Sequence, residues 1–368
     1  MRIIYFFTFD YSLKTLKDSG SLDREVKYFE HLNINYGYTF LLVTYGSKGD
    51  YTILNNYDFI EVLPLYSLFS RSKSKLIRYF LSFYYPFKIK KLAGDFQIIK
   101  QNQLLGSWVS IIFKFITRKK LFVRTGYDMY WFSKMDNKPT YITFLYFLLT
   151  KVTLYFSDIY SATSIEDIKI LARIDKKKDV ELIPNWVEDL NHTPYGLRHT
   201  NKILCVGRLE YQKNYEHLFK AIAGTKIEVD IYGDGSLRND LEKLSNTLGI
   251  NVNFKGTLEY EALKNVYQSY KIFVSSSLFE GNPKSTLEAM SAGCVPVVSS
   301  IPNNIEIIEN NTDGVLFSFQ EGLGDLIVNL FQQKNKLQEL SNNSYRKVIQ
   351  KNSIVAVAEL ENTVIKKL

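Results

Sequence analysis

Short apolar runs alternate with longer segments of helical periodicity along the whole chain. Segments such as 22–32 and 104–116 place apolar residues three and four positions apart, which predicts helices with one buried face. Several of the runs between such segments, such as 39–44 and 295–298, are apolar at nearly every position, which is typical of strands buried on both faces of a parallel sheet. Strands are predicted at residues 2–7, 39–44, 59–63, 96–100, 121–124, 159–162, 180–184, 202–206, 226–232, 252–254, 272–275, 295–298 and 314–317.

This alternation predicts an α/β fold whose parallel sheets are joined by right-handed crossovers. The pattern restarts after a polar stretch, EDLNHTPYGLRHT, which is predicted to link two domains. A chain of 368 residues also exceeds what one hydrophobic core usually supports, and two domains of roughly 180 residues fit that limit. The predicted organisation is a first domain at 1–187, a linker at 188–200, a second domain at 201–340 and a C-terminal helical segment at 341–368.

Composition indicates a globular protein, with 46% hydrophobic and 23% charged residues. Cys205 and Cys294 lie in apolar, strand-like contexts, so we expect buried free thiols in a reducing compartment and hence a cytoplasmic protein. The opening MRIIYFFTFDYS predicts a strand and lacks the pattern of a cleaved leader. The apolar segment 141–156 is shorter than the roughly 20 residues of a membrane span and contains Lys151. It is predicted to be a buried helix of the first domain.

Candidate chemistry is concentrated in residues 279–298, FEGNPKSTLEAMSAGCVPVV. Glu280 precedes a turn, and Glu288 lies in the helix that follows. That helix is predicted at 283–292, with Asn282 as the N-cap and Pro283 at the first helical position. Its N-terminus then opens beside the carboxyl end of strand 272–275, where open α/β sheets bind ligands and where phosphate is favoured.

A second candidate lies after the strand that opens the second domain, in the sequence GRLEYQKN. Arg208 supplies a guanidinium fork and Lys213 a point charge, which together suit a diphosphate. Asn214 is predicted to cap the next helix, 215–223. The alternative is a solvated basic turn. Because this loop and the Glu280 segment lie at one sheet edge, we favour phosphate binding.

The segment 279–298 resembles the donor-binding motif of retaining GT-B-fold glycosyltransferases, in particular family 4, the glycosyl transferases group 1. The motif is a Glu, seven residues, a second Glu, a helix ending in small residues and a Pro-Val-Val strand. The matching positions are Glu280, Gly281, Glu288, Ala289, Gly293, Pro296, Val297 and Val298. The resemblance implies two facing Rossmann-like domains, with the donor on the second, the acceptor on the first, and a C-terminal segment that packs back on the first.

The resemblance also assigns roles to residues. Arg208 and Lys213 would bind the donor diphosphate, Glu288 the ribose and Glu280 the donor sugar. The Gly233-Asp-Gly235 turn would line the nucleotide site, and Thr257 and Leu258 would hold the base, although the residues alone indicate only turns there. The other predicted donor-binding positions are Gly20, Gly207, Gly281, Asn282, Pro283, Lys284, Ser285 and Thr286.

The first domain departs from the family pattern. The loop Asp18-Ser-Gly-Ser21 is expected to follow the first strand and precede a helix, as a candidate for cradling a phosphate or lining the acceptor cleft. It contains a single glycine, Gly20, where the family has a richer loop. None of the histidines, at positions 31, 192, 199 and 217, falls near the strand 121–124 where the family often has one. Asp128 and Tyr127 are the candidates for a catalytic contribution from this domain. The alternative for Asp128 is a helix N-cap.

These residues predict a retaining glycosyltransferase that moves a sugar from a UDP- or GDP-linked donor to a glycan or lipid-linked acceptor in cell-surface polysaccharide synthesis. The sequence contains no D-x-D triplet, so neither a metal nor another cofactor is expected. Two alternatives stay open: a non-hydrolysing nucleotide-sugar 2-epimerase, which would need a catalytic histidine, and a basic binding module without catalysis.

The formal charge of +8 raises the question of an acidic partner. Basic residues cluster with aromatic and aliphatic ones in the stretch 71–91, RSKSKLIRYFLSFYYPFKIKK, which contains no acid. Its three interpretations are a plain amphipathic helix, a patch for RNA and a surface for anionic lipid. The plain helix is favoured and the membrane is second, at the inner face of the plasma membrane; nucleic acid is not predicted as a partner.

Overall fold

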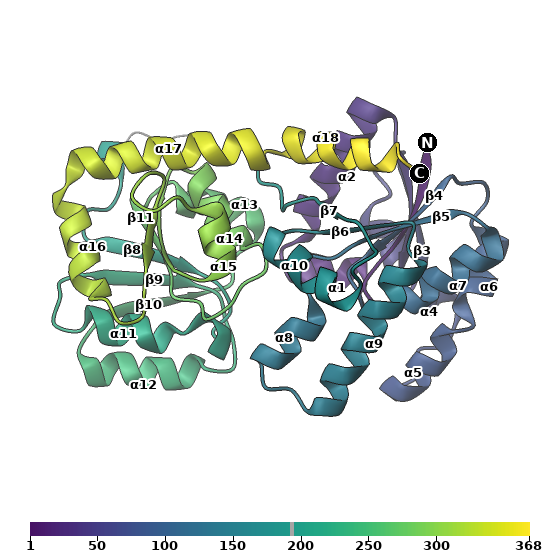
Figure 1. Cartoon of the computed structure of the whole chain (residues 1–368), viewed down its shortest axis with the longest axis horizontal. Helices are drawn as coiled ribbons and strands as arrows, with labels where there is room; N and C mark the ends of the chain where they lie inside the picture. Colours follow the sequence, from purple (N-terminus) through teal and green to yellow (C-terminus); the bar gives the residue numbers. More distant parts are fainter. Residues whose placement is uncertain (192–194) are drawn as a thin grey trace. The chain divides into compact units, whose positions relative to one another are not determined.

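A computed structural model describes residues 1–191 and 195–368, which form two compact units (Figure 1). Unit 1 comprises Met1–Ile183 with Ala358–Leu368, and unit 2 comprises Pro184–Val357. The division therefore falls just before the predicted linker 188–200, of which residues 192–194 lie outside the described residues. The C-terminal segment predicted from 341 stays in unit 2 as far as Val357, and the chain joins unit 1 only from Ala358.

Unit 1 contains a parallel sheet with the strand order β3-β2-β1-β4-β5-β6-β7. The order reverses between β1 and β4, because β2 and β3 lie to one side of β1 and the later strands to the other. Every strand coincides with a predicted apolar run. The strands are β1 (Arg2–Phe6), β2 (Thr39–Thr44), β3 (Ile60–Pro64), β4 (Ile98–Asn102), β5 (Lys120–Arg124), β6 (Ile159–Ala162) and β7 (Val180–Leu182).

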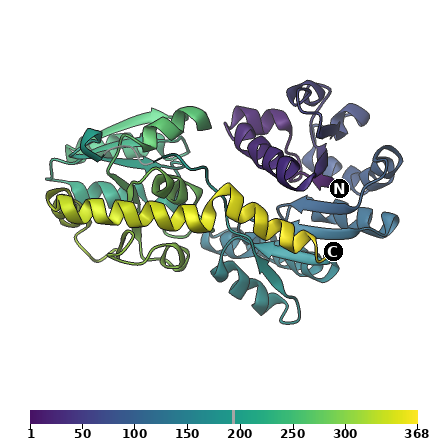
Figure 2. The ribbon, with the colours of Figure 1, turned by 90° about the horizontal axis from the view of Figure 1, so that it is seen from above.

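Helices cover both faces of this sheet. One face packs against α6, α7, α9 and α10, and the other against α2 and the C-terminal helix α18. The first and last residues of the chain lie on the same side of unit 1 (Figures 1 and 2). The helices are α1 (Leu13–Asp18), α2 (Leu22–Tyr36), α3 (Asp50–Ile53), α4 (Leu65–Leu68), α5 (Lys75–Ser82), α6 (Tyr85–Leu92), α7 (Ser107–Thr117), α8 (Met129–Met135), α9 (Thr140–Phe156), α10 (Ile165–Ile174) and α18 (Ile354–Ile365).

The prediction for segment 141–156 was half right. It forms the helix α9, but this helix is not buried: several of its apolar side chains face solvent. Periodicity predicts which positions share a face of a helix, and it does not say which face packs inward. Among residues 1–191 and 195–368, no helix is both long enough and apolar enough to cross a membrane.

Unit 2 repeats the architecture with the strand order β10-β9-β8-β11-β12-β13. Alternate residues of the central strand β8 face opposite layers: Ile203 and Cys205 pack with α11, α12 and α16, and Leu204 packs with α13, α14 and α17. Cys205 and Cys294 are buried free thiols, as predicted. The strands are β8 (Lys202–Val206), β9 (Glu228–Tyr232), β10 (Asn251–Gly256), β11 (Ile272–Ser275), β12 (Val295–Ser299) and β13 (Val315–Phe317).

The helices of unit 2 connect these strands in turn. The short 3-10 segment η2 (Tyr211–Lys213) precedes α11 and belongs to the predicted phosphate loop. The helices are α11 (Tyr215–Ile222), α12 (Arg238–Leu248), α13 (Tyr260–Tyr267), α14 (Lys284–Ser291), α15 (Pro302–Ile307), α16 (Leu323–Gln332) and α17 (Lys334–Asn352).

Candidate active site

The sheet order of unit 2 brings the two predicted motifs together. Strands β8 and β11 are parallel neighbours, and the strand order reverses between them. The loops that leave their carboxyl ends carry GRLEYQKN and FEGNP, respectively. Such a reversal is where open α/β sheets bind ligands, because the two loops diverge to opposite faces of the sheet.

Several hydrogen bonds join the two loops directly. Ser276 Oγ donates to the backbone oxygens of Lys213 and Asn214, at 2.9 Å each. The backbone nitrogen of Leu278 donates to Gln212 O at 2.8 Å. Asn214 occupies the N-cap position of α11, but its side chain makes no capping bond. The reason is its left-handed backbone, with φ of 49°. The loops therefore form one joined structure.

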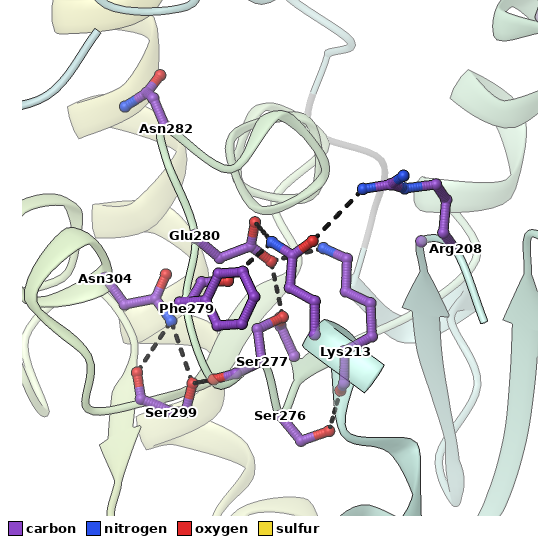
Figure 3. A network of polar contacts seen from close by, with 12 residues as sticks. Arg208, Lys213, Ser276, Ser277, Phe279, Glu280, Asn282, Ser299 and Asn304 are labelled. Carbon is purple, nitrogen blue, oxygen red and sulfur yellow. Dashed lines mark hydrogen bonds and ion pairs between the residues drawn. The ribbon is translucent and has the colours of Figure 1, made fainter. Parts of the chain in front are cut away.

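A lysine–glutamate ion pair lies at the centre of this structure (Figure 3). Lys213 Nζ is 2.5 Å from Glu280 Oε1, and Ser277 Oγ donates to the same oxygen at 2.7 Å. Both side chains are largely shielded, with exposed fractions of 14% for Lys213 and 8% for Glu280. Hydrogen bonds to a charged carboxylate are stronger than neutral ones, so this network holds Glu280 in one orientation.

Gln212 extends the network towards Arg208. Its Nε2 donates to Phe279 O at 2.8 Å and to Glu280 Oε2 at 3.3 Å, and its Oε1 accepts from Arg208 Nη2 at 3.4 Å. Arg208 itself is exposed. The arrangement places a guanidinium fork, an ammonium and an oriented carboxylate at one sheet edge, which suits a diphosphate bonded to a hydroxyl-rich group.

The prediction that Asn282 caps the next helix was wrong. Helix α14 begins at Lys284, Pro283 occupies the N-cap position, and no side chain caps the helix. Asn282 turns away to Asn185, whose backbone nitrogen donates to Asn282 Oδ1 at 2.9 Å and whose Nδ2 donates to Asn282 O at 2.7 Å. The physical reason is burial: both asparagines are enclosed, so their polar groups must be paired within the protein.

The first turn of α14 leaves backbone N–H groups without helical acceptors, as every helix N-terminus does. These belong to the predicted positions Lys284, Ser285 and Thr286, which follow the buried Gly281. The Thr286 hydroxyl is buried without a hydrogen-bond partner among the described residues. An anion next to this turn would meet both the amides and the positive end of the helix dipole.

Glu288 lies one turn further along α14, in different surroundings from Glu280. Its carboxylate is buried and accepts a hydrogen bond from the Tyr267 hydroxyl at 3.1 Å. Burial raises the pKa of Tyr267, and the negative charge of Glu288 adds to the rise. Glu280 thus has an ammonium partner, and Glu288 has a phenol.

The Gly233-Asp-Gly235 turn supports the phosphate loop from the side. A Cβ atom on Gly233, where φ is 145°, would lie 2.0 Å from Gly207 O, and one on Gly235 would lie 2.5 Å from Leu209 O. Only glycine allows this approach. Thr257 and Leu258 follow β10 at the same edge and are exposed. The glycines therefore have a packing role, whatever they contribute to nucleotide binding.

Unit 1 places its predicted residues less favourably for the predicted roles. Gly20 was expected to follow the first strand directly, but α1 intervenes, and Gly20 lies in the turn between α1 and α2 with φ of 68°. Asp128 is buried and caps α8, where its Oδ1 accepts from Trp131 N at 2.6 Å, so the N-cap alternative is confirmed. Burial raises the pKa of Asp128 to about 6, and the Trp131 amide opposes the rise. Tyr127 beside it is partly exposed.

Sequence reasoning missed three residues that hold the site: Gln212, Ser277 and Asn185. Gln212 lies inside the recognised motif, next to Lys213, so its position was a usable signal. Asn185 lies 97 positions from Asn282, and nothing local indicates that the two pair. Within residues 1–191 and 195–368, no three His, Cys, Asp or Glu side chains come together as metal ligands.

The fold consists of two α/β units, each with a parallel sheet. In unit 2 a cluster of charged side chains lies where the strand order reverses. Together these features are typical of the GT-B class of fold. A structure of an Anabaena protein in complex with UDP and glucose has the same fold, with a TM-score of 0.78 over all of both chains at 16% sequence identity. Residues 188–347 match the family described as glycosyl transferases group 1, and this region of the chain belongs to that family.

Two relatives extend the comparison. A Campylobacter jejuni α-1,4-N-acetyl-D-galactosaminyltransferase, named for a diphosphoundecaprenol-linked saccharide, is 29% identical over 208 residues, which are 53% of this chain and 56% of that protein. An uncharacterized glycosyltransferase of Methanocaldococcus jannaschii is 36% identical over 139 residues, 36% of each chain. The chain therefore spans about half or less of the length of these relatives.

Proposed function

We propose that this protein is a glycosyltransferase that moves a sugar from a UDP- or GDP-linked donor to a lipid-linked or glycan acceptor in cell-surface polysaccharide synthesis. The observation that carries the proposal is the Lys213–Glu280 pair with Arg208 nearby, at the reversal point of the unit 2 sheet. Membership of residues 188–347 in glycosyl transferases group 1 supports the same reaction class.

The proposed chemistry follows from the charge that develops during transfer. Cleavage of the bond between the sugar and the diphosphate leaves its electron pair on the β-phosphate oxygen. Arg208, Lys213 and the first-turn amides of α14 would stabilise that charge, so no metal is required. Glu288 would accept hydrogen bonds from the ribose hydroxyls, with Tyr267 fixing its orientation.

Glu280 would bind the hydroxyls of the donor sugar and stabilise the positive charge that builds up on its ring. We propose transfer with retention of configuration, by attack of the acceptor hydroxyl on the face that the leaving diphosphate vacates. The departing phosphate oxygen would take the proton of that hydroxyl. Lys213 must then move from Glu280 towards the phosphate, or bridge both, which a flexible ammonium stem permits.

The acceptor is proposed to bind at unit 1. Asp128 lies at the carboxyl end of β5, and its raised pKa of about 6 suits a group that orients or exchanges a proton with a hydroxyl near neutral pH. The named substrate of the Campylobacter jejuni relative is linked to undecaprenol, which supports a lipid-linked acceptor here. We therefore place the protein at the inner face of the plasma membrane, with the stretch 71–91 towards the lipid.

The test is incubation of the purified protein with UDP- and GDP-sugars, with and without an undecaprenyl-diphosphate saccharide, in EDTA. Release of nucleoside diphosphate that depends on the acceptor, with an elongated lipid product, is the expected result. An isomerised sugar nucleotide would instead indicate a 2-epimerase, and no reaction with any donor would leave only a binding module. A requirement for Mg²⁺ or Mn²⁺ would overturn the metal-free mechanism. The Lys213→Ala variant, run in parallel, shows whether product arises at this site.

A further inference from the structure

Helix α9 of unit 1 presents a stripe of apolar side chains to solvent, while three of its four buried residues are threonines. The buried residues of this helix are Thr143, Thr150, Thr153 and Leu154. Those that face outward are Tyr141, Phe144, Leu145, Leu148, Val152 and Tyr155, with exposed fractions between 41% and 72%. Their spacing of three, four, seven, eleven and fourteen positions puts them on one stripe of the helix.

Hydroxyl groups hold the inward face in place. Thr153 Oγ1 lies 2.8 Å from Ser107 Oγ on α7, and Ser133 Oγ on α8 donates to Thr143 Oγ1 at 3.1 Å. A helix in water would place its apolar stripe inward and its threonines outward, because apolar area is what burial stabilises. In α9 three of the four buried residues are threonines instead, and two of them, Thr143 and Thr153, pair with hydroxyl groups of α8 and α7.

A second exposed apolar surface lies on α5 and the start of α6. Leu76, Ile77, Phe80, Phe83 and Tyr84 are exposed by 50% to 76%. Basic residues precede and follow them, at 71, 73, 75, 88, 90 and 91, and the segment 71–92 contains no Asp or Glu. Asp10, in the loop after β1, pairs with Arg78 at 2.8 Å and with Arg71 at 3.5 Å. Lys73, Lys88 and Lys91 remain exposed at the rim of this apolar surface.

Both surfaces lie towards the carboxyl edge of the unit 1 sheet. Arg78 ties α5 to Asp10 after β1, and α8 and α9 follow the carboxyl end of β5. Figure 1 shows α5, α8 and α9 projecting beyond the sheet on the same side. Burial raises the pKa of Tyr79 on α5, and the phenol of Tyr146 on α9 adds to the rise, so the two helices are within electrostatic reach.

We propose that the outer face of α9 enters the interfacial layer of an anionic bilayer beside α5, so that unit 1 holds the membrane by two different means. The basic rim of α5 and α6 attracts anionic headgroups, and the apolar stripe of α9, with the exposed Lys151 at its edge, buries apolar area among the acyl chains. This inference rests on the proposed membrane location and adds a second, apolar element to it. The carboxyl edge of the unit 1 sheet would then face the lipid that carries the acceptor.

A bilayer fits these surfaces better than a second copy of the chain. In a symmetric dimer the same patch meets itself, so the basic segments 71–92 would be brought together with no acid on either of them. Anionic headgroups supply the missing negative charge. The apolar stripe of α9, in turn, is matched by acyl chains without any need for shape complementarity.

The experiment is co-sedimentation with vesicles of phosphatidylcholine alone and of phosphatidylcholine with phosphatidylglycerol. The α9 variant carries Phe144→Gln, Leu145→Gln and Leu148→Gln, because glutamine keeps helix propensity. The charge variant carries Lys73→Glu, Lys88→Glu and Lys91→Glu. Ile34→Gln, at an exposed apolar position of α2, is the matched control.

The wild type and Ile34→Gln are expected to bind the anionic vesicles, and both triple variants to bind at least roughly tenfold more weakly. If the α9 variant binds like the wild type while the charge variant does not, α9 lies outside the membrane and the inference fails, while the membrane location stands. If the wild type binds neither kind of vesicle, both fail. A wild-type dimer that the α9 variant converts to a monomer would assign the stripe to a second copy and overturn the inference.

The thermal shift produced by nucleoside diphosphate provides the control for folding and for the proposed transferase site. All variants are expected to keep this shift, because none of the substitutions lies in unit 2. If the wild type shows no thermal shift with nucleoside diphosphate, this result counts against the proposed function. The vesicle experiment then still decides whether α9 binds the membrane.

Discussion

A lysine–glutamate pair of unit 1 differs in almost every respect from the pair at the centre of the unit 2 site. In unit 2, Lys213 and Glu280 come from neighbouring loops, and 14% and 8% of their side-chain surfaces are exposed. In unit 1, Lys100 on β4 and Glu361 on α18 are exposed by only 4% and 1%. The Tyr28 hydroxyl donates to Glu361 Oε2 at 3.1 Å, and Lys100 lies over the rings of Tyr5 and Phe122, 5.4 Å from each centroid.

The surroundings assign the pairs different tasks. Besides Lys213, Glu280 accepts hydrogen bonds from a serine and a glutamine at a loop edge, so under the proposed function a diphosphate would draw Lys213 away without leaving the carboxylate unpaired. The Lys100–Glu361 pair is sealed by aromatic rings, and burial lowers the pKa of Lys100 while Glu361 opposes the fall. Removing either charge would leave the other enclosed without compensation. The position of the Lys213–Glu280 pair suits an exchange of ion partners. The Lys100–Glu361 pair holds α18 against β4.

The largest effect is therefore expected in unit 1. Glu361→Ala should lower the free energy of unfolding by about 3–5 kcal/mol, because it strands the Lys100 ammonium in a buried position. Urea unfolding followed by circular dichroism measures this change. The double variant Lys100→Met with Glu361→Leu should recover most of the loss, because two apolar side chains leave no charge to compensate.

The control for Glu361→Ala is the exposed pair Lys367–Glu181, also in unit 1, whose side chains are 53% and 32% exposed. Glu181→Ala should cost less than about 1 kcal/mol, as surface ion pairs do. Equal effects of Glu361→Ala and Glu181→Ala would show that burial does not distinguish the two pairs, and the comparison would break.

In unit 2, removing a charged side chain of the site should affect turnover more than stability. Lys213→Ala and Arg208→Ala should each lower kcat by ~100-fold or more, the scale of losing one stabiliser of transition-state charge. Steady-state assays of nucleoside diphosphate release measure the change, with the melting temperature recorded for each variant. Lys220→Ala is the matched control, since this lysine pairs with Glu216 on the exposed face of α11. Turnover within threefold of wild type in folded Lys213→Ala would rule out the phosphate role.

The difference between the pairs also marks how far sequence reasoning reaches. Lys213 and Glu280 each lie in a loop that follows a predicted strand, so the sequence could predict that they lie at the same sheet edge. The apolar strands could be predicted in the same way, from local sequence. Lys100 and Glu361 are 261 positions apart, and each looks like a surface residue until the sheet and α18 are assembled. Burial that depends on distant contacts has no local signature.

The same limit explains the errors. Asn282 has the residue type and the position expected of an N-cap, but it accepts hydrogen bonds from the distant Asn185 instead of capping the helix. Helix α9 was predicted to be buried because its sequence is strongly apolar, but apolar composition does not say which side chains pack inward. Gly20 was assigned to a strand-to-helix loop because the six-residue helix α1 is too short to leave a periodic pattern.

The two glutamates of the donor motif allow a finer test within unit 2. Glu288→Gln should weaken binding of the bare nucleoside diphosphate by ~1–3 kcal/mol, the scale of hydrogen bonds to a charged group. Glu280→Gln should leave that binding nearly unchanged and lower the transfer rate, because its proposed contacts are with the sugar. Calorimetric titration of both variants decides this, with Glu216→Gln as an exposed control. The opposite pattern would reverse the roles, and no effect in either variant would make the pair structural.

Asp128 completes the comparison, because it is a buried carboxylate that has a backbone amide in place of an ammonium. Its pKa is raised by burial from 3.8 to about 6, so between these values the folded state holds its proton more tightly than the unfolded state does. The free energy of unfolding should therefore fall as the pH rises through this window, and this contribution should be flat above and below it. The shift corresponds to at most about 3 kcal/mol.

Asp128→Asn tests this directly, because asparagine also caps helices and has no charge to lose. The variant should match the wild type at about pH 4 and exceed it by about 1–2 kcal/mol near neutral pH, since burying the extra amide hydrogens offsets part of the gain. Urea midpoints across the pH range measure the difference, and Asp158→Asn is the contrasting control. Lysine partners lower the pKa of that carboxyl against the effect of burial, so its replacement should destabilise the protein near neutral pH. A difference between Asp128→Asn and wild type that does not vary with pH would show that the pKa of Asp128 is the same in the folded and the unfolded state. A buried carboxylate in this unit would then be stable without an ammonium partner, and the distinction drawn from Lys100 and Glu361 would lose its physical basis.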